Sequence, residues 1–111
     1  MKNIKDNKYF LEKIKEDLID IQDFTNNLDY EGFSRDEMIK SAVCFKFIQI
    51  FENAKQVELN HDEEFNLTII KLRGFRNRIV HEYGNVDFCE IFNTIKDDVP
   101  NFLRVVTKNI K

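Results

Sequence analysis

The chain has 111 residues, of which 42% are hydrophobic and 33% are charged, with three glycines, one proline and a net charge of -3. This length suits one core, so we expect a single domain over residues 1–111. So few glycines and prolines argue against a loop-rich β-sandwich, and the ample apolar content argues against disorder. The negative charge excludes a globally basic nucleic-acid-binding protein, although a local basic site remains open.

Cysteine and histidine are too sparse for a structural zinc site. Cys44 and Cys89 lie far apart, neither belongs to a CxxC pair, and His61 and His81 are the only histidines. We expect two buried, reduced thiols and a surface position for His61. Neither a secretory leader nor an apolar run of membrane-spanning length is visible, so the expected location is the cytoplasm.

The first predicted helix ends near residues 26–27 and carries apolar side chains at steps of three and four residues. These are Phe10, Ile14, Leu18, Ile21 and Phe24 or Thr25. A turn over residues 27–32 is expected to follow.

Ser34 and Glu37 predict the start of the second helix. The Ser34 hydroxyl can accept from the Glu37 amide while Glu37 reaches back, as in a capping box, and Phe33 and Met38 flank it like a hydrophobic staple. The helix runs to about Val57 and is apolar over more than one stripe. The residues that widen its apolar side are Cys44, Phe45 and Ile48. Such a helix packs on more than one neighbour or forms part of an oligomer interface.

A third helix is predicted from about Glu63 to Tyr83, ended by Gly84-Asn85 as a C-terminal cap. Its core stripe is Ile69, Leu72, Phe75 and Ile79. A fourth helix covers roughly residues 87–99, and Pro100 in a first turn opens the last one. No segment is typical of a strand, so the predicted fold is all-α, an up-and-down bundle of four to five helices.

Residues 65–81 contain no acidic side chain, in a chain with 20 of them. The basic residues of this stretch are Lys71, Arg73, Arg76 and Arg78. Their positive field suits a phosphate-bearing ligand. The alternative is that they form ordinary ion pairs with acidic residues of neighbouring helices.

Arg73, Asn77 and His81 follow one another at intervals of four residues and share one polar helix face. Arg76 lies about 140° around the helix from His81. These two side chains converge only through their length, through local bending, or across two copies of the helix that face each other. The last arrangement predicts a composite site in a homodimer.

Gly74 interrupts the same helix at a cost of about 1 kcal/mol relative to alanine. Such a glycine often marks a place where another backbone or a ligand comes close. The alternative is neutral drift in a helix that packing stabilises.

Residues 76–83 read RNRIVHEY and fit the motif R-x4-H-x-Y. With this motif, the chain resembles the HepT-like toxins, a branch of the HEPN (higher eukaryote and prokaryote nucleotide-binding) superfamily. The similarity extends to the leading amphipathic helix, to the helix from Ala42 to Ala54 with Glu52, and to the segments 86–87 and 95–100. It therefore covers nearly the whole chain.

The resemblance implies an α-helical homodimer that cleaves RNA without a metal or another cofactor. Arg76 and His81 match the catalytic positions, which line a cleft between the two protomers. It also implies a toxin of a type II toxin–antitoxin module, paired with an MntA-like nucleotidyltransferase antitoxin. In that family the partner can transfer AMP to the motif tyrosine, here Tyr83, where a bulky anion would block RNA.

The residue types suit this chemistry. Histidine can move a proton to or from an RNA oxygen near neutral pH, so His81 is assigned to proton transfer. An arginine fork matches a phosphorane-like transition state, so Arg76 is assigned to its stabilisation. The supporting residues are Asn77, which can orient either side chain, and Arg73, Arg78 and Lys71, which can hold the RNA backbone.

Other interpretations remain open from sequence. His81 can cap a helix end, and Tyr83 can pack its ring with a hydrated hydroxyl. The alternative function is a non-catalytic HEPN subunit that presents a nucleotide or another substrate to a nucleotidyltransferase, and a third is a purely structural helical dimer. The intact arginine and histidine favour the nuclease, whereas the acidic net charge favours the scaffold.

Overall fold

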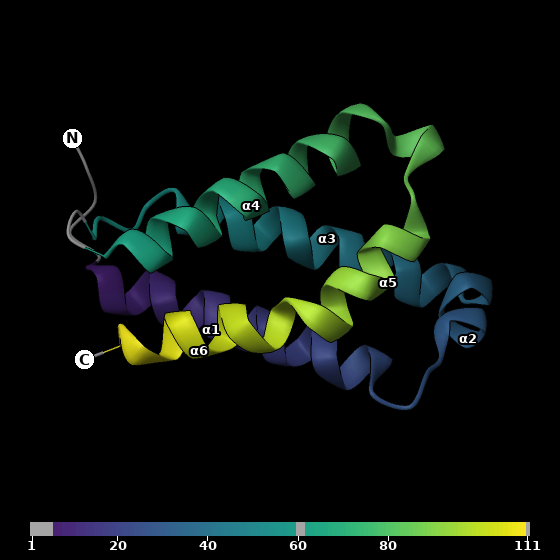
Figure 1. Cartoon of the computed structure of the whole chain (residues 1–111), viewed down its shortest axis with the longest axis horizontal. Helices are drawn as coiled ribbons and strands as arrows, with labels where there is room; N and C mark the ends of the chain where they lie inside the picture. Colours follow the sequence, from purple (N-terminus) through teal and green to yellow (C-terminus); the bar gives the residue numbers. More distant parts are fainter. Residues whose placement is uncertain (1–5, 60–61, 111) are drawn as a thin grey trace.

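The computed structural model describes residues 6–59 and 62–110, and within these ranges every regular element is helical. The elements are α1 (Asn7–Thr25), α2 (Tyr30–Arg35), α3 (Glu37–Ala54), α4 (Glu63–His81), a 3₁₀ turn η1 (Tyr83–Asn85), α5 (Phe88–Asp97) and α6 (Val99–Lys108) (Figure 1). The predicted all-α fold is confirmed. The short helix α2 is additional to the four to five helices expected.

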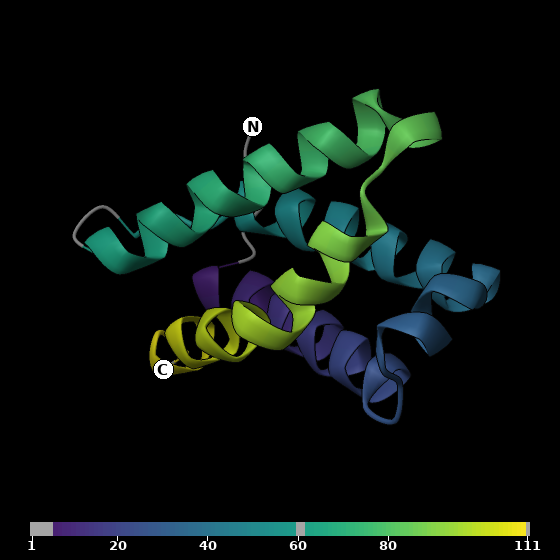
Figure 2. The ribbon, with the colours of Figure 1, turned by 45° about the vertical axis from the view of Figure 1, so that its right-hand side comes forward.

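The long helices alternate in direction, as an up-and-down bundle requires. In Figure 1, α1 and α4 run one way, while α3 and the consecutive pair α5–α6 run back. α1 packs against both α3 and α6, and α4 packs against α3. Towards its C-terminal end α4 rises away from α5 (Figure 2). The C-terminal half of α4 is therefore held mainly by α3.

Each α-helix follows an aspartate, and five of these side chains accept a bond from an amide of the first turn. The bonds run to Asp6 from Tyr9 (3.2 Å), to Asp29 from Gly32 (2.8 Å), to Asp36 from Ile39 (2.9 Å), to Asp62 from Phe65 (2.9 Å) and to Asp87 from Glu90 (3.1 Å). α6 follows Asp98 without such a bond and has proline in its first turn, as predicted. Each cap satisfies an orphan N–H and contributes about 1 kcal/mol.

The predicted capping box at Ser34 is wrong. Ser34 lies inside α2, where its hydroxyl donates to the carbonyl of Glu31 at 3.0 Å. The cap of α3 is Asp36 instead. The physical reason is that Asp29 starts a helical turn within the segment expected to be a turn, and this turn absorbs Ser34.

The expected hydrophobic staple is also absent, because Phe33 is fully buried while Met38 is exposed to solvent. The apolar side of α3 is wide, as predicted, but its members differ. Cys44 is buried and Ile48 partly buried, whereas Phe45 remains 61% exposed.

The C-terminal end of α4 differs from the prediction. The helix stops at His81, and the chain continues through the 3₁₀ turn rather than through a left-handed cap. No described residue has a positive φ. The amide of Asn85 donates to the carbonyl of Glu82 at 2.7 Å, which closes this turn without the conformational freedom of Gly84.

The two thiols have different environments, so the prediction of two buried cysteines is right for Cys44 and wrong for Cys89. Burial raises the pKa of the Cys44 thiol to about 11. Cys89 is exposed near the start of α5. His61 lies outside the described residues. In the part of the chain that is described, every helix is too short or too polar to span a membrane.

A partly buried ion pair joins α1 to α3. Lys46 Nζ lies 3.0 Å from Asp17 Oδ1 and 3.0 Å from Asp20 Oδ2. Burial raises the pKa of Asp17 above its ordinary value, against the opposing effect of the hydrogen bond from Lys46. Hydrogen bonds to Asp17 and Asp20 raise the pKa of Lys46. This contact fixes the position of α3 along α1. It therefore also fixes the position of the helix on which α4 packs.

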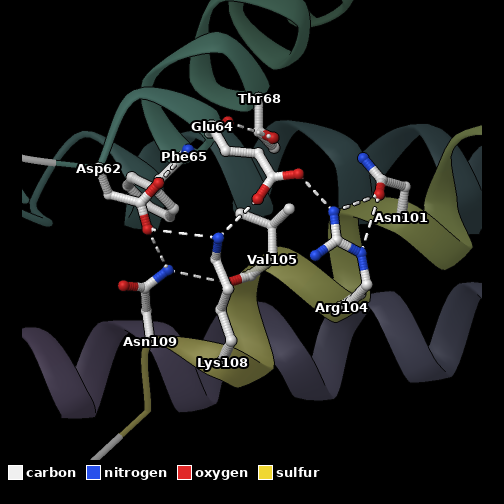
Figure 3. Close-up of polar contacts among 9 residues, drawn as sticks. All are labelled: Asp62, Glu64, Phe65, Thr68, Asn101, Arg104, Val105, Lys108 and Asn109. Atoms are coloured by element: carbon white, nitrogen blue, oxygen red, sulfur yellow. Dashed lines mark hydrogen bonds and ion pairs between the residues drawn. The ribbon is translucent and has the colours of Figure 1, made fainter.

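A second polar network ties the start of α4 to the end of α6 (Figure 3). Asp62 accepts from Asn109 Nδ2 at 2.9 Å, and Glu64 forms ion pairs with Lys108 and Arg104. The backbone amide of Phe65, then the side chain of Asn109, lowers the pKa of Asp62. The hydrogen bond from Lys108, followed by that from Arg104, lowers the pKa of Glu64.

Replacing Asp62 tests this network and its pH dependence. We expect Asp62→Ala to lower the free energy of unfolding by about 1 kcal/mol at pH 7, because a cap is lost. Asp62→Asn keeps an acceptor and loses the charge, so its deficit is smaller. The pKa of Asp62 is lowered by folding, so the contribution of its charge is complete above the unfolded value of about 4 and is lost as the pH falls through the folded value.

Urea denaturation of wild type, Asp62→Ala, Asp62→Asn and the control Glu63→Ala from pH 7 to pH 2 measures both effects. Glu63 is an exposed residue of the same first turn that does not cap the helix. Equal stability of Asp62→Ala and wild type at pH 7, or a deficit of Asp62→Asn that persists at pH 2, would contradict the prediction.

Candidate functional site

The candidate site lies on α4, whose two sides have different characters. Phe65, Thr68, Leu72, Phe75 and Ile79 form the buried side. The predicted core stripe is therefore confirmed at its last three positions, while Ile69 is only partly buried. The rings of Phe47 on α3 and Phe75 on α4 pack edge to face, with their centroids 4.8 Å apart. This contact fixes the rotation of α4 directly beside the R-x4-H-x-Y motif.

Arg76 lies at the boundary between α4 and α3, with its side chain 28% exposed. Its Nη2 is 3.7 Å from Oε2 of Glu52, and its Nη1 donates to Asn77 Oδ1 at 3.0 Å. The buried Nε has no acceptor among the described residues. An unsatisfied buried donor costs about 1–3 kcal/mol. Both Nη atoms of the guanidinium group thus have one partner each, and each retains a second N–H that an anion could accept.

The predicted polar face of Arg73, Asn77 and His81 is solvent-exposed along its length. His81 is the last residue of α4. Within the described residues, the side chains of Arg73 and His81 form no hydrogen bond and no ion pair. Both side chains are accessible to a ligand in solution. The Asn77 amide oxygen accepts a hydrogen bond from Nη1 of Arg76.

The basic residues of α4 divide into two groups. Arg78 Nε donates to Glu90 Oε1 on α5 at 3.2 Å, and its guanidinium lies over the ring of Phe75. Arg76 and Arg78 therefore both form the cross-helix ion pairs that the alternative interpretation anticipated. Lys71 and Arg73 are exposed and have no ion pair in the described part of the chain. These two are the cations most available to a phosphate backbone.

Gly74 is not explained by close packing within this chain. A Cβ built on it would meet Arg78 Nη1 at 3.7 Å, an ordinary contact. The glycine lines a cavity of about 340 Å³ between α4 and the pair α5–α6. The expected close approach of a backbone is therefore wrong for the described residues, since α4 and α5 diverge here.

An apolar surface adjoins Arg76. Phe45, Ile48 and Glu52 share one face of α3, and Arg76 and Val80 share one face of α4, because residues three or four apart are neighbours on a helix. The contact between Glu52 and Arg76 joins the two faces. We call these five residues the outer α3–α4 face. Phe45 and Val80 are exposed there and line a hollow of about 420 Å³.

Tyr83 is placed by its backbone in η1, directly after α4, but its side chain lies outside what the structure describes. In the described residues no three His, Cys, Asp or Glu side chains are arranged to hold a metal ion. Sequence reasoning missed the contacts of Glu52. The available signal was a charged residue at the edge of the apolar side of α3, four positions after Ile48.

The chain is similar to several ribonuclease-named proteins. The model of the family described as "Ribonuclease HepT-like" matches residues 14–108. "Putative RNase MJ1216" of Methanocaldococcus jannaschii is 32% identical over 108 residues, covering 96% of this chain and 89% of that protein. "Putative RNase MJ0125" of the same organism is also 32% identical, covering 96% and 93%.

A relative from another organism carries the family name itself. "Probable ribonuclease HepT" of Thermococcus cleftensis is 28% identical over 96 residues, covering 85% of this chain and 86% of that protein. No solved structure gives a significant match. The family match spans α2 to α6 completely, including the whole R-x4-H-x-Y motif. The chain therefore belongs to the HepT-like ribonuclease family.

Proposed function

We propose that this chain is a single-domain endoribonuclease toxin of a type II toxin–antitoxin module that acts in the cytoplasm. The carrying observation is that a half-buried Arg76 and an exposed His81 lie on one helix in a HepT-like chain. The acid-free stretch of α4 from residue 65 to residue 81 supports RNA as the substrate, because exposed Lys71 and Arg73 suit phosphates.

In this proposal RNA cleavage requires no metal ion. His81 accepts the proton of the 2′-hydroxyl as that oxygen attacks the phosphorus, or donates a proton to the leaving 5′-oxygen as its bond to phosphorus breaks. Arg76 binds the phosphate oxygens as negative charge develops on them. Asn77 orients Arg76 through the hydrogen bond at 3.0 Å. Arg73, Arg78 and Lys71 hold neighbouring phosphates of the RNA backbone.

The proposed site is completed by a second copy of the chain. Arg76 and His81 point in directions about 140° apart on α4, so one protomer presents them to different regions. The outer α3–α4 face exposes Phe45 and Val80 beside Arg76, which supports this face as the contact surface. A two-fold arrangement then brings the motif residues of both protomers to one cleft.

The proposed antitoxin is an MntA-like nucleotidyltransferase that adds AMP to Tyr83. The support is the position of Tyr83 in the motif and the exposed backbone that follows it in η1. AMP would introduce a phosphate anion two residues from His81. Repulsion of the RNA backbone and steric exclusion would together close the site.

Substitution of the motif residues tests the catalytic assignment. We expect His81→Ala and Arg76→Ala to reduce RNA cleavage by the purified chain about 10²- to 10⁴-fold, the usual contribution of positioned acid–base and electrostatic groups. His61→Ala, the other histidine, is the matched control. Expression of each variant alone, with growth and total RNA as readouts, extends the test to cells. A harmless wild-type chain that leaves RNA intact would favour the non-catalytic subunit.

Introducing a charge on the outer α3–α4 face by substitution tests whether this face forms the dimer contact. We expect Phe45→Glu to halve the mass measured by light scattering and to abolish RNA cleavage, since a buried unpaired carboxylate opposes association. Ile70→Glu is the control, because Ile70 is 58% exposed on α4, close to the 61% of Phe45, but lies outside this face. An unchanged mass for Phe45→Glu would place the dimer contact elsewhere.

Intact mass spectrometry tests the modification. After co-expression with an MntA-like nucleotidyltransferase, we expect the chain to gain the mass of one or more AMP groups, and Tyr83→Phe to gain none at this position. Tyr30→Phe is the control, because this exposed tyrosine lies far from the motif in sequence. Tight binding without any mass gain would show inhibition by masking instead.

A further inference from the structure

Glu52 on α3 holds the guanidinium group of Arg76 from outside the motif helix. Its Oε2 is 3.7 Å from Arg76 Nη2, in a contact between two different helices. We infer that Glu52 is a positioning residue for Arg76 in RNA cleavage. This inference rests on the proposed function, and it assigns a role to a residue that lies outside the R-x4-H-x-Y motif.

The contact is built on rigid support. The Phe47–Phe75 ring contact, with centroids 4.8 Å apart, fixes α3 against α4 nearby: Phe75 directly precedes Arg76, and Phe47 lies five residues before Glu52. Asn77 accepts from Nη1 at 3.0 Å while Glu52 lies beside Nη2. The two ends of the guanidinium fork therefore have separate partners. Such a two-point hold restricts rotation of a long side chain that would otherwise sample many rotamers.

The charge balance leaves Arg76 able to bind phosphate. Glu52 also pairs with Lys55, whose Nζ lies 2.9 Å from Oε1. This shorter contact draws on the same carboxylate, so Glu52 only partly neutralises Arg76. A guanidinium group has five N–H donors. The Nε of Arg76 is buried, but each Nη carries two N–H groups, and its single partner takes up at most one of them. Glu52 thus orients the fork and leaves N–H groups of both Nη atoms for a phosphate.

A second ion pair on α4 provides a matched comparison. Arg78 pairs with Glu90 of α5 at 3.2 Å, and the side chain of Glu90 is 46% exposed, against 45% for Glu52. Both carboxylates thus belong to cross-helix pairs with an arginine of the same helix. Removing Glu90 costs a similar surface ion pair but leaves Arg76 and its partners in place.

The kinetic experiment compares kcat and KM for wild type, Glu52→Ala, Glu52→Gln and Glu90→Ala. We expect Glu52→Ala to lower kcat about tenfold to a hundredfold with KM changed less than threefold, because displacement of a positioned group by about 1 Å can cost 10²-fold. Glu52→Gln keeps an acceptor and recovers part of kcat. Glu90→Ala releases Arg78, which is assigned to the RNA backbone, so we expect any effect of this variant in KM and an unchanged kcat. Melting temperatures within about 5 °C and an unchanged mass by light scattering exclude unfolding and dissociation.

An unchanged or increased kcat in Glu52→Ala would overturn the inference, and an increase would identify Glu52 as a competitor of the phosphate. Nitrogen-15 relaxation of arginine Nε–H groups provides a readout that needs no activity. The Arg76 signal, assigned by its loss in Arg76→Lys, is expected to become mobile in Glu52→Ala and to stay ordered in Glu90→Ala. An ordered Arg76 signal in Glu52→Ala would also overturn the inference.

The kinetic and the relaxation experiments together distinguish failure of the proposed function from failure of the positioning role of Glu52. If wild type cleaves no RNA, the proposed function is wrong, and the relaxation experiment still decides whether Glu52 orders Arg76. If wild type cleaves RNA and Arg76→Ala does not, but Glu52→Ala cleaves like wild type, the proposed function stands and the positioning role is wrong.

Discussion

The packing of α3 between α1 and α4 is the constraint on which the rest of the structure depends. Val43, Phe47 and Ile50 are fully buried on this helix, and burial of each such side chain contributes about 1.5–3 kcal/mol. The ion pair of Lys46 with Asp17 sets the position of α3 along α1, and the Phe47–Phe75 contact sets the rotation of α4. The orientation of the R-x4-H-x-Y motif is therefore a consequence of core packing two helices away.

Much of this fold could be predicted because long amphipathic helices repeat their apolar positions. The apolar periodicity of the first predicted helix ends near Thr25, which is the observed end of α1. The periodicity of the third predicted helix begins near Glu63, which is the observed start of α4. The short helix α2 could not be found this way, since six residues are less than two turns. Ser34 and Asp36 are both good caps, and only the tertiary position of α2 selects Asp36.

The candidate site was predictable only as far as it lies on one helix. The spacing of Arg73, Asn77 and His81 was sufficient to place them on one exposed face. Nothing local indicates that Glu52 faces Arg76, because the register between two helices depends on how their side chains interlock. Gly74 shows the opposite limitation. The free-energy cost of a glycine inside a helix can be predicted from the local sequence. The reason for keeping the glycine would lie in a group that approaches the helix from outside, which the local sequence does not indicate.

The acidic and the basic side chains of α4 lie in different parts of the helix. Its first turn carries Glu63 and Glu64 after Asp62, and its basic residues follow from Lys71 onwards. A helix of 19 residues extends about 28 Å, more than three Debye lengths of about 8 Å at physiological salt. The two ends are therefore electrically independent in solution. An incoming polyanion responds to the end that it meets rather than to the total charge, so α4 gives an acidic protein a direction in which RNA can approach.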